Sequence, residues 1–147
     1  MALLSNIVAL DSGIKLIKIT TMHKITQNIL LFNKEGHILL LKHKAGKWLL
    51  PGGRLNDGEN WLDGLKRELK EEAGIKSFKI TDIIDVDSWD EASGYRYAVF
   101  FKGETKNSKV VVSNEIIDYA WSKNMQDLKH YNLWFHGLSK LIKKAFQ

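Results

Sequence analysis

The stretch that decides the fold reads Gly53-Arg-Leu-Asn-Asp-Gly-Glu59-Asn-Trp-Leu-Asp-Gly-Leu-Lys-Arg67-Glu68-Leu69-Lys-Glu71-Glu72-Ala-Gly74-Ile75. From Trp61 to Ala73 the apolar residues recur every three or four positions, which predicts a helix with one apolar stripe: Leu62, Leu65, Leu69 and Ala73. Asn60 can cap the start of this helix, and Gly74 suits its end because glycine accepts a left-handed backbone. The sequence therefore predicts a helix over residues 61–73 that follows directly on a glycine-containing loop.

The same helix concentrates negative charge on one face. Glu68, Glu71 and Glu72 are three and four positions apart, so their side chains share a face beside the leucine stripe. Like charges at these spacings destabilise a helix by about 0.2 to 0.5 kcal/mol per pair, so a half-buried trio requires a cation. Oxygen ligands favour a hard ion such as Mg²⁺, for which Mn²⁺ could substitute. Gly64, one turn earlier, is expected to leave room for the metal and a phosphate.

This stretch resembles the signature of the Nudix hydrolases, Gly-x5-Glu-x7-Arg-Glu-U-x-Glu-Glu-x-Gly-U, where U is a bulky aliphatic residue. Every specified position is satisfied between Gly53 and Ile75, and this segment is called the box below. The resemblance continues on both sides, through Lys47–Gly53 before the box and through Glu115–Leu128 after it. It implies an α/β fold, an α/β/α sandwich with a mixed central sheet and two main helices.

The resemblance also implies roles for individual residues. Mg²⁺ would be bound by the backbone carbonyl of Gly52 and by the carboxylates of Glu68, Glu71 and Glu72. Arg67 would orient the carboxylates through charge-assisted hydrogen bonds, and Glu59 would brace the loop against the helix. The ions would lower the pKa of a bound water and hold it in line with the phosphorus under attack.

The general base is the least transferable role, because family members use either a glutamate of the box or a residue on a late loop. Glu115 is the candidate on a late loop, since it precedes the strand expected to end at Trp121. Glu71 and Asp118 remain alternatives. The predicted catalytic residues are therefore Arg67, Glu71 and Glu115.

Apolar runs around the box predict the remaining elements. Residues 26–32 and 37–42 flank a turn-forming cluster and predict a hairpin, and Trp48–Leu50 predicts a third strand. Further strands are expected over residues 80–86, 95–102, 110–113 and 119–121. A second helix is expected over 127–145, with five residues inward: Leu128, Leu138, Leu141, Ile142 and Ala145. Strands with two interspersed helices favour an α/β sandwich.

Residues 1–147 are expected to form a single domain, because the chain has no repeat, low-complexity tract or linker. Residues 1–22 are expected to be an amino-terminal extension or an edge strand, with Ile14–Ile19 the part that favours a strand. The apolar start lacks a basic region and a cleavage site, so it does not match a signal peptide. No run approaches the roughly 18 apolar residues of a membrane helix. We expect a cytoplasmic protein without membrane association.

Composition limits the chemistry. The absence of cysteine excludes disulfides, thiolate metal ligands and a cysteine nucleophile. The formal net charge of +5 favours a polyanionic ligand. The histidines show no paired zinc spacing, and Gly52 and Gly53 belong to no P-loop or dinucleotide fingerprint. Carboxylates must therefore carry any metal chemistry.

Two groups of residues near the late strands have a simple interpretation. Asp85, Asp87, Asp90 and Glu91 lack the glycine of a calcium loop, so a solvated loop is expected after residue 86. The aromatic residues Trp89, Tyr95 and Tyr97 could stack on a base, but aromatic residues in strands more often pack in the sheet. None of them belongs to the predicted site.

The predicted function is Mg²⁺-dependent hydrolysis of a phosphoanhydride bond in a nucleoside diphosphate linked to another group. The partner is then a small nucleotide, such as a nucleoside triphosphate, a nucleotide sugar or a dinucleoside polyphosphate. Hydrolysis of pyrophosphate at an RNA 5′ end is the alternative that a basic chain supports weakly. A non-catalytic nucleotide sensor is a third hypothesis, which the intact box disfavours. A homodimer is a further possibility, since dimers are common in the family.

Overall fold

The structure, a computed structural model, describes residues 7–10, 13–16, 23–92, 94–124, 126–134 and 137–147. Its main sheet follows the order β5-β4-β3-β8-β7, with β6 paired to β3 and β9 paired to β4. The strands are β3 (His23–Phe32), β4 (Ile38–His43), β5 (Trp48–Leu49), β6 (Gly52–Arg54), β7 (Lys79–Glu91), β8 (Gly94–Glu104) and β9 (Ile116–Ser122). Because β3 and β8 are parallel while the other pairs are antiparallel, the sheet is mixed, as predicted.

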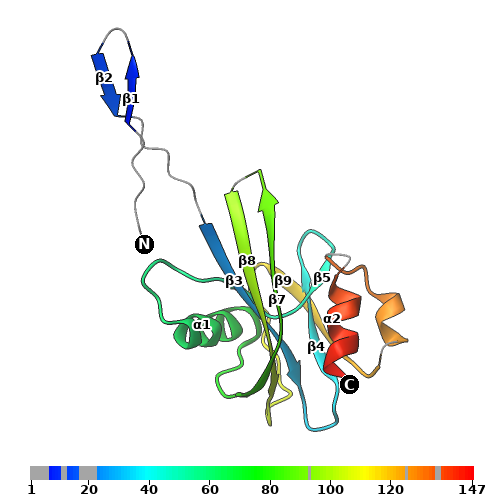
Figure 1. The fold of residues 1–147 in the computed structure, drawn as a ribbon. Helices are drawn as coiled ribbons and strands as arrows, with labels where there is room; N and C mark the ends of the chain where they lie inside the picture. Colours follow the sequence, from blue (N-terminus) through cyan, green and yellow to red (C-terminus); the bar gives the residue numbers. More distant parts are fainter. Residues whose placement is uncertain (1–6, 11–12, 17–22, 93, 125, 135–136) are drawn as a thin grey trace.

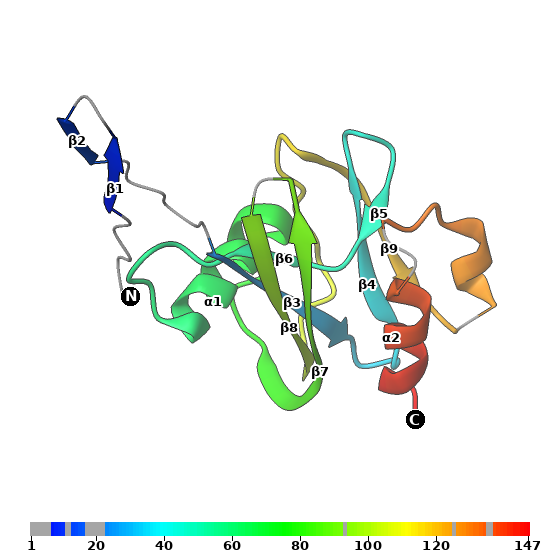
Figure 2. The same ribbon diagram turned by 45° about the horizontal axis from the view of Figure 1, so that its top comes forward.

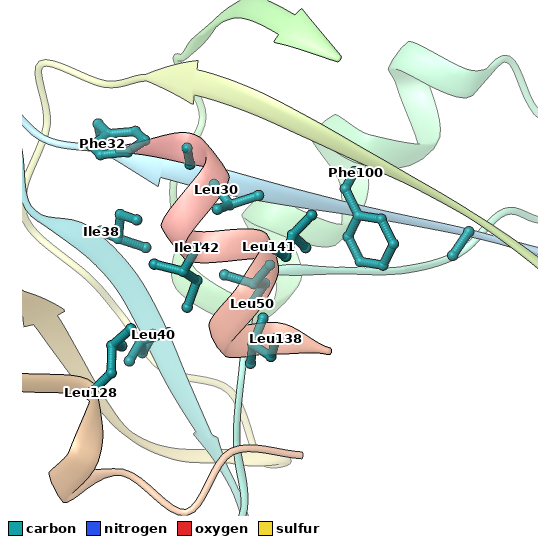
Figure 3. Close-up of a cluster of buried hydrophobic side chains, with 12 residues drawn as sticks. Leu30, Phe32, Ile38, Leu40, Leu50, Phe100, Leu128, Leu138, Leu141 and Ile142 are labelled. Carbon is teal, nitrogen blue, oxygen red and sulfur yellow. The ribbon is translucent and has the colours of Figure 1, made fainter. Parts of the chain in front are cut away.

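Two helices cover the opposite faces of this sheet, α1 (Trp61–Ala73) and α2 (Leu138–Ala145) (Figures 1 and 2). Side chains alternate along a strand, so successive residues of β3 face different helices. Ile29 and Leu31 belong to the core cluster beneath α1, whereas Leu30 and Phe32 belong to the cluster with α2. Figure 3 shows this second cluster around α2. The predicted α/β/α sandwich is confirmed.

The amino-terminal residues form a separate pair of strands. β1 (Ile7–Leu10) and β2 (Gly13–Leu16) are antiparallel and belong to a two-stranded sheet of their own. The strand expected at Ile14–Ile19 coincides with β2 only as far as Leu16, and residues 17–22 lie outside the described residues.

The helix of the box begins and ends where the sequence predicts. The Asn60 side chain accepts a hydrogen bond from the Leu62 N–H at 3.0 Å and so caps the first turn. Gly74 adopts the left-handed conformation at φ 67°, and its N–H reaches back to the carbonyls of Leu69 and Lys70. Leu65, Leu69 and Ala73 are buried under this helix, whereas Leu62 is only half-buried.

The expected hairpin of residues 26–42 is correct only at its turn. Phe32 pairs with Ile38, and the Asn33 side chain accepts the N–H groups of Glu35 and His37. Farther along β3 the neighbouring strand is instead β6, because Thr26 pairs with Arg54 and Asn28 with Gly52. The sequence did not predict β6 as a strand. The turn at Gly52 and Gly53, called the glycine turn below, is thus hydrogen-bonded into the sheet.

The helix expected over residues 127–145 is wrong in its middle. The chain forms a short 3-10 helix, η1 (Asp127–His130), and enters α2 only at Leu138. Between them the backbone is hydrogen-bonded to β5: the Trp48 N–H donates to the Asn132 carbonyl, and the Trp48 carbonyl accepts from the Trp134 N–H. The five residues expected to face inward are nevertheless buried: Leu128, Leu138, Leu141, Ile142 and Ala145.

Two other strand predictions are corrected. Residues 110–113 form no strand, because the Val111 N–H donates to the Ala73 carbonyl at the end of α1 and only Val110 is buried. The expected solvated loop after residue 86 is part of β7, which pairs with β8 as far as Glu91 opposite Gly94. The strand expected over residues 119–121 lies within the longer β9. None of the described helices is long and apolar enough to cross a membrane.

We expect Leu65→Ala to lower the free energy of unfolding by about 2 to 5 kcal/mol, because it leaves a cavity under α1. Leu65 is fully buried, whereas its neighbour Lys66 is exposed on the same helix. Lys66→Ala is therefore the matched control and should change stability by less than about 0.5 kcal/mol. Urea denaturation measures both values, and equal effects of the two substitutions would contradict the packing of α1.

Candidate active site

Arg67 holds the loop and the helix of the box together. Its Nε and Nη2 donate to Glu59 Oε1 at 2.7 Å and Oε2 at 3.0 Å. Nη2 also donates to the Arg54 carbonyl at 3.2 Å. Nη1 donates to Glu68 at 2.9 Å and to Glu71 at 3.3 Å. One planar guanidinium thereby fixes the loop and orients two of the predicted carboxylates, as expected of Arg67.

Glu59 braces the loop, also as expected. The hydrogen bonds from Arg67 lower the pKa of Glu59 from 4.5 to about 2, and the Asn56 N–H, which donates at 3.0 Å, adds to this effect. The same contact with Glu59 raises the pKa of Arg67 above its ordinary range. The pair is therefore charged at every physiological pH.

The interpretation of Gly64 is wrong. A Cβ atom at Gly64 would lie 2.6 Å from Leu55 Cδ1 and 2.9 Å from Glu59 Oε2. The space above this glycine is thus filled by the braced loop and does not receive a metal or a phosphate. Gly64 lets the loop pack directly on α1.

Glu68 and Glu72 face the glycine turn. The Gly52 N–H donates to Glu72 Oε2 at 3.4 Å, and a Cβ at Gly53 would lie 2.6 Å from Glu68 Cδ. Gly52 has φ 136°, and a Cβ there would collide with the Gln27 carbonyl, so only glycine fits. The turn therefore lets the backbone approach two carboxylates that lie one helical turn apart.

The pKa of Glu72 is raised from 4.5 to about 9, mainly by burial and next by the negative charge of Glu68, while the hydrogen bond from the Gly52 N–H acts in the opposite direction. The charge of Glu115 contributes in the same direction. Without a cation the pair therefore retains a proton at neutral pH. A hard divalent cation would relieve both the repulsion and the burial of charge, so the donor set fits Mg²⁺.

The other predicted site residues are more exposed. The side chain of Glu71 is 59% exposed, against 16% for Glu68, and contacts Arg67. The Glu115 side chain is 71% exposed and lies 3.6 Å from Lys44 Nζ. Among the described residues, no three acidic or histidine side chains gather closely enough to enclose a metal ion. Glu68 and Glu72 are half-buried and Glu71 is exposed, a ligand set that leaves room for waters and substrate oxygens around an ion such as Mg²⁺.

A cleft of about 960 Å³ lies on the α2 side of the sheet. Asn28 connects it to the glycine turn, since Asn28 pairs with Gly52 and its Nδ2 donates to the Leu50 carbonyl at 3.5 Å. The lining comes from β3, β7, β8, α2 and the segments beside them: Thr26, Asn28, Leu49, Leu50, Asp85, Asp87, Trp89, Glu91, Arg96, Phe100, Trp134, Gly137, Lys140 and Leu141. Its size suits a small molecule as large as a nucleotide.

None of the cleft residues belongs to the site predicted from the sequence. The sequence analysis leaves Trp89 outside the predicted site and assigns Asp87 and Glu91 to a solvated loop. The detectable signal is the alternation Asp85, Asp87, Trp89, Glu91, which places polar or aromatic residues on one face of a strand. Tyr95 and Tyr97 alternate with Arg96 and are not among the lining residues.

The raised pKa of Glu72 predicts a pH dependence of stability in the presence of chelator. The folded protein keeps a proton that the unfolded chain loses, so unfolding becomes easier as pH rises from about 4.5 to about 9. Glu59 does not titrate in this window, because its pKa is lowered to about 2. We expect the melting temperature of the wild type to fall more steeply between pH 5.5 and 8.5 than that of Glu72→Gln, as monitored by circular dichroism. Parallel curves would show that Glu72 is already ionised in the metal-free fold.

Comparison with known proteins agrees with this geometry. The model of the Nudix domain matches residues 22–136. Nucleoside triphosphatase NudI of Klebsiella pneumoniae (strain 342) is 32% identical over 119 residues, which cover 70% of this chain and 84% of that protein. NudI of Escherichia coli O139:H28 (strain E24377A / ETEC) is 33% identical over 120 residues, with the same shares.

Solved structures share the fold. The MutT protein from Methanosarcina mazei Go1 has a TM-score of 0.73 and 27% identity, covering 87% of this chain and 96% of that one. A C. elegans Ap4A hydrolase in a binary complex has a TM-score of 0.70 at 20% identity, covering 82% and 93%. With the family model matching most of its length and relatives above 30% identity, the chain belongs to the Nudix family and is a Nudix hydrolase.

Proposed function

We propose that this enzyme hydrolyses a phosphoanhydride bond of nucleoside 5′-triphosphates in the presence of Mg²⁺. The observation that carries the proposal is the half-buried pair Glu68 and Glu72, which lies against the Gly52–Gly53 turn at the side of a nucleotide-sized cleft. The similarity to proteins named nucleoside triphosphatase supports the triphosphate over other nucleotides. We place the enzyme in the cytoplasm, where these substrates occur.

The residues proposed to hold Mg²⁺ are Glu68, Glu72 and the carbonyl of Gly52. Glu71 is proposed to join them, because a single 3.3 Å contact with Arg67 leaves its exposed carboxylate free to turn. When bound, the ion neutralises charge on the phosphates and lowers the pKa of a coordinated water. Arg67 keeps Glu68 in a fixed orientation.

Glu115 is proposed as the general base. Its backbone carbonyl accepts the Lys44 N–H at 2.9 Å, which anchors the loop, while its side chain remains exposed for proton transfer. Its charge acts on Glu72, which supports a place on the same side of the molecule. Glu71 and Asp118 are the alternatives. The Asp118 carboxylate accepts a hydrogen bond from the N–H of the next residue, Tyr119, at 2.8 Å.

Metal removal tests the proposal directly. We expect nucleoside triphosphate hydrolysis to vanish in excess chelator and to return with Mg²⁺ or Mn²⁺. Glu68→Gln and Glu72→Gln should each abolish turnover. Metal-free Glu72→Gln should melt no lower than wild type at neutral pH, because glutamine has the shape and the neutral charge of the protonated Glu72 carboxyl. Glu35→Gln, in the exposed turn after β3, is the matched control and should retain full activity. Undiminished turnover in chelator would overturn the proposal.

Replacement of Glu115 tests the base. Glu115→Gln should lower kcat by about 10² to 10⁴ fold, the usual effect of losing a general base, with Mg²⁺ affinity nearly intact. Asp118→Asn should change kcat less than threefold if Glu115 is the base. The reverse result would move the role to Asp118, and full activity of both variants would move it to Glu71.

The salt dependence of kcat/KM separates a small nucleotide from an RNA 5′ end. A triphosphate contacts few cationic groups and should give a shallow dependence. An RNA chain that contacts many lysines should give a steep one. Binding of triphosphates without any hydrolysis would instead favour the non-catalytic sensor.

A further inference from the structure

One wall of the cleft is a fixed network on β7 and β8. Trp89 Nε1 donates to Glu91 Oε1 at 3.1 Å, and Glu91 is held by Arg96, whose Nη2 donates to Oε2 at 3.0 Å. Arg96 Nη1 donates to Thr26 Oγ1 at 3.2 Å, and the guanidinium lies 6.0 Å from the Trp89 ring centre. The indole is thus held at its nitrogen and lies near a cation. It nevertheless stays 38% exposed and lines the cleft.

A held, partly exposed indole suits stacking against a flat aromatic ligand. Loss of rotamer freedom on binding is small, because Trp89 is already fixed by Glu91 and Arg96. Base stacking on an aromatic side chain contributes to binding of every base, but a purine offers the larger area. The cleft, at about 960 Å³, accommodates a purine with its sugar.

Asp87 lies two residues before Trp89 on the same strand and lines the same cleft. The other cleft carboxylates are paired, Asp85 with Lys144 at 2.8 Å and Glu91 with Arg96 at 2.8 Å. Within the described part of the chain no cation pairs with Asp87, whose Oδ1 accepts the N–H of the next residue, Ser88, at 2.8 Å. A carboxylate accepts hydrogen bonds and donates none, so Asp87 selects a ligand edge that carries N–H groups.

Resting on the proposed function, we propose that Trp89 stacks on the nucleobase and Asp87 reads its edge, so that the enzyme selects guanine nucleotides. Guanine presents N1–H and a 2-amino N–H side by side, which matches the two oxygens of one carboxylate. Cytosine and adenine place a ring nitrogen acceptor beside their amino group, and uracil flanks its one N–H with carbonyls. These three bases would bring an oxygen or nitrogen lone pair against the carboxylate.

The test compares GTP with ITP, which differs only in lacking the 2-amino group. Wild type should show a kcat/KM for GTP about 10- to 100-fold above that for ITP, the usual effect of one hydrogen bond to a charged group. Asp87→Asn should reduce this ratio to within about threefold of unity. Asp90→Asn is the matched control, because Asp90 lies on the same strand but does not line the cleft. Trp89→Ala should raise KM for GTP and ITP alike and leave their ratio unchanged.

Binding of GMP and IMP, followed by quenching of tryptophan fluorescence, separates failure of this inference from failure of the proposed function. Tighter binding of GMP that is lost in Asp87→Asn supports the base selection even if no triphosphate is hydrolysed. Hydrolysis of triphosphates with a GTP to ITP ratio near unity, or with a ratio that survives in Asp87→Asn, would overturn the selection by Asp87. A wild-type preference for pyrimidine triphosphates would also overturn it.

Discussion

The hydrogen bonds made by the Arg67 guanidinium are the interaction on which the candidate active site depends. It joins the loop at Arg54 and Glu59 to the helix face that carries Glu68 and Glu71. A lysine could match the charge but not five directed donors, so the geometry requires a guanidinium. Because Gly64 lets that loop lie directly on α1, the cross-link is short and partly shielded from water.

This cross-link makes a locally unfavourable arrangement tolerable. Glu68 and Glu72 lie one helical turn apart, and Glu72 is buried enough that its carboxyl keeps a proton at neutral pH. Gly52 brings its backbone to the same place in a conformation that only glycine fits, and Gly53 leaves the space that the Glu68 carboxylate occupies. The fold thus holds two acidic groups close together at a cost in pKa, and sites of function are where such local conflicts are expected.

The sequence predicted what local contacts determine. Helix α1 and its caps lie within about twenty residues, so the spacing of apolar residues and the capping residues predicted them. The resemblance to the Nudix box implied the brace between Arg67 and Glu59, which is equally local. The errors arose where distant backbone decides the outcome. The backbone of Trp48 is hydrogen-bonded to residues 132 and 134, which interrupts the expected second helix. The Val111 N–H donates to the Ala73 carbonyl, so residues 110–113 do not form the expected strand. The sequence did not predict the cleft, because its residues Thr26, Trp89 and Arg96 come from three strands, and the spacing of residues along the chain does not reveal which strands pair.

Local contacts form the site proposed for the reaction, whereas contacts between distant segments form the cleft proposed for base selection. The metal ligands proposed at the glycine turn lie on strand β6 and helix α1, which Arg67 joins, so their relative positions change little when β7 or β8 varies. The cleft is assembled from β3, β7, β8 and α2, and side chains such as Asp87 are exposed on its wall. A substitution on β7 can therefore alter which base is bound without disturbing Arg67 or the paired glutamates. Selectivity can then change from one family member to another while the box, and the reaction it supports, stays the same.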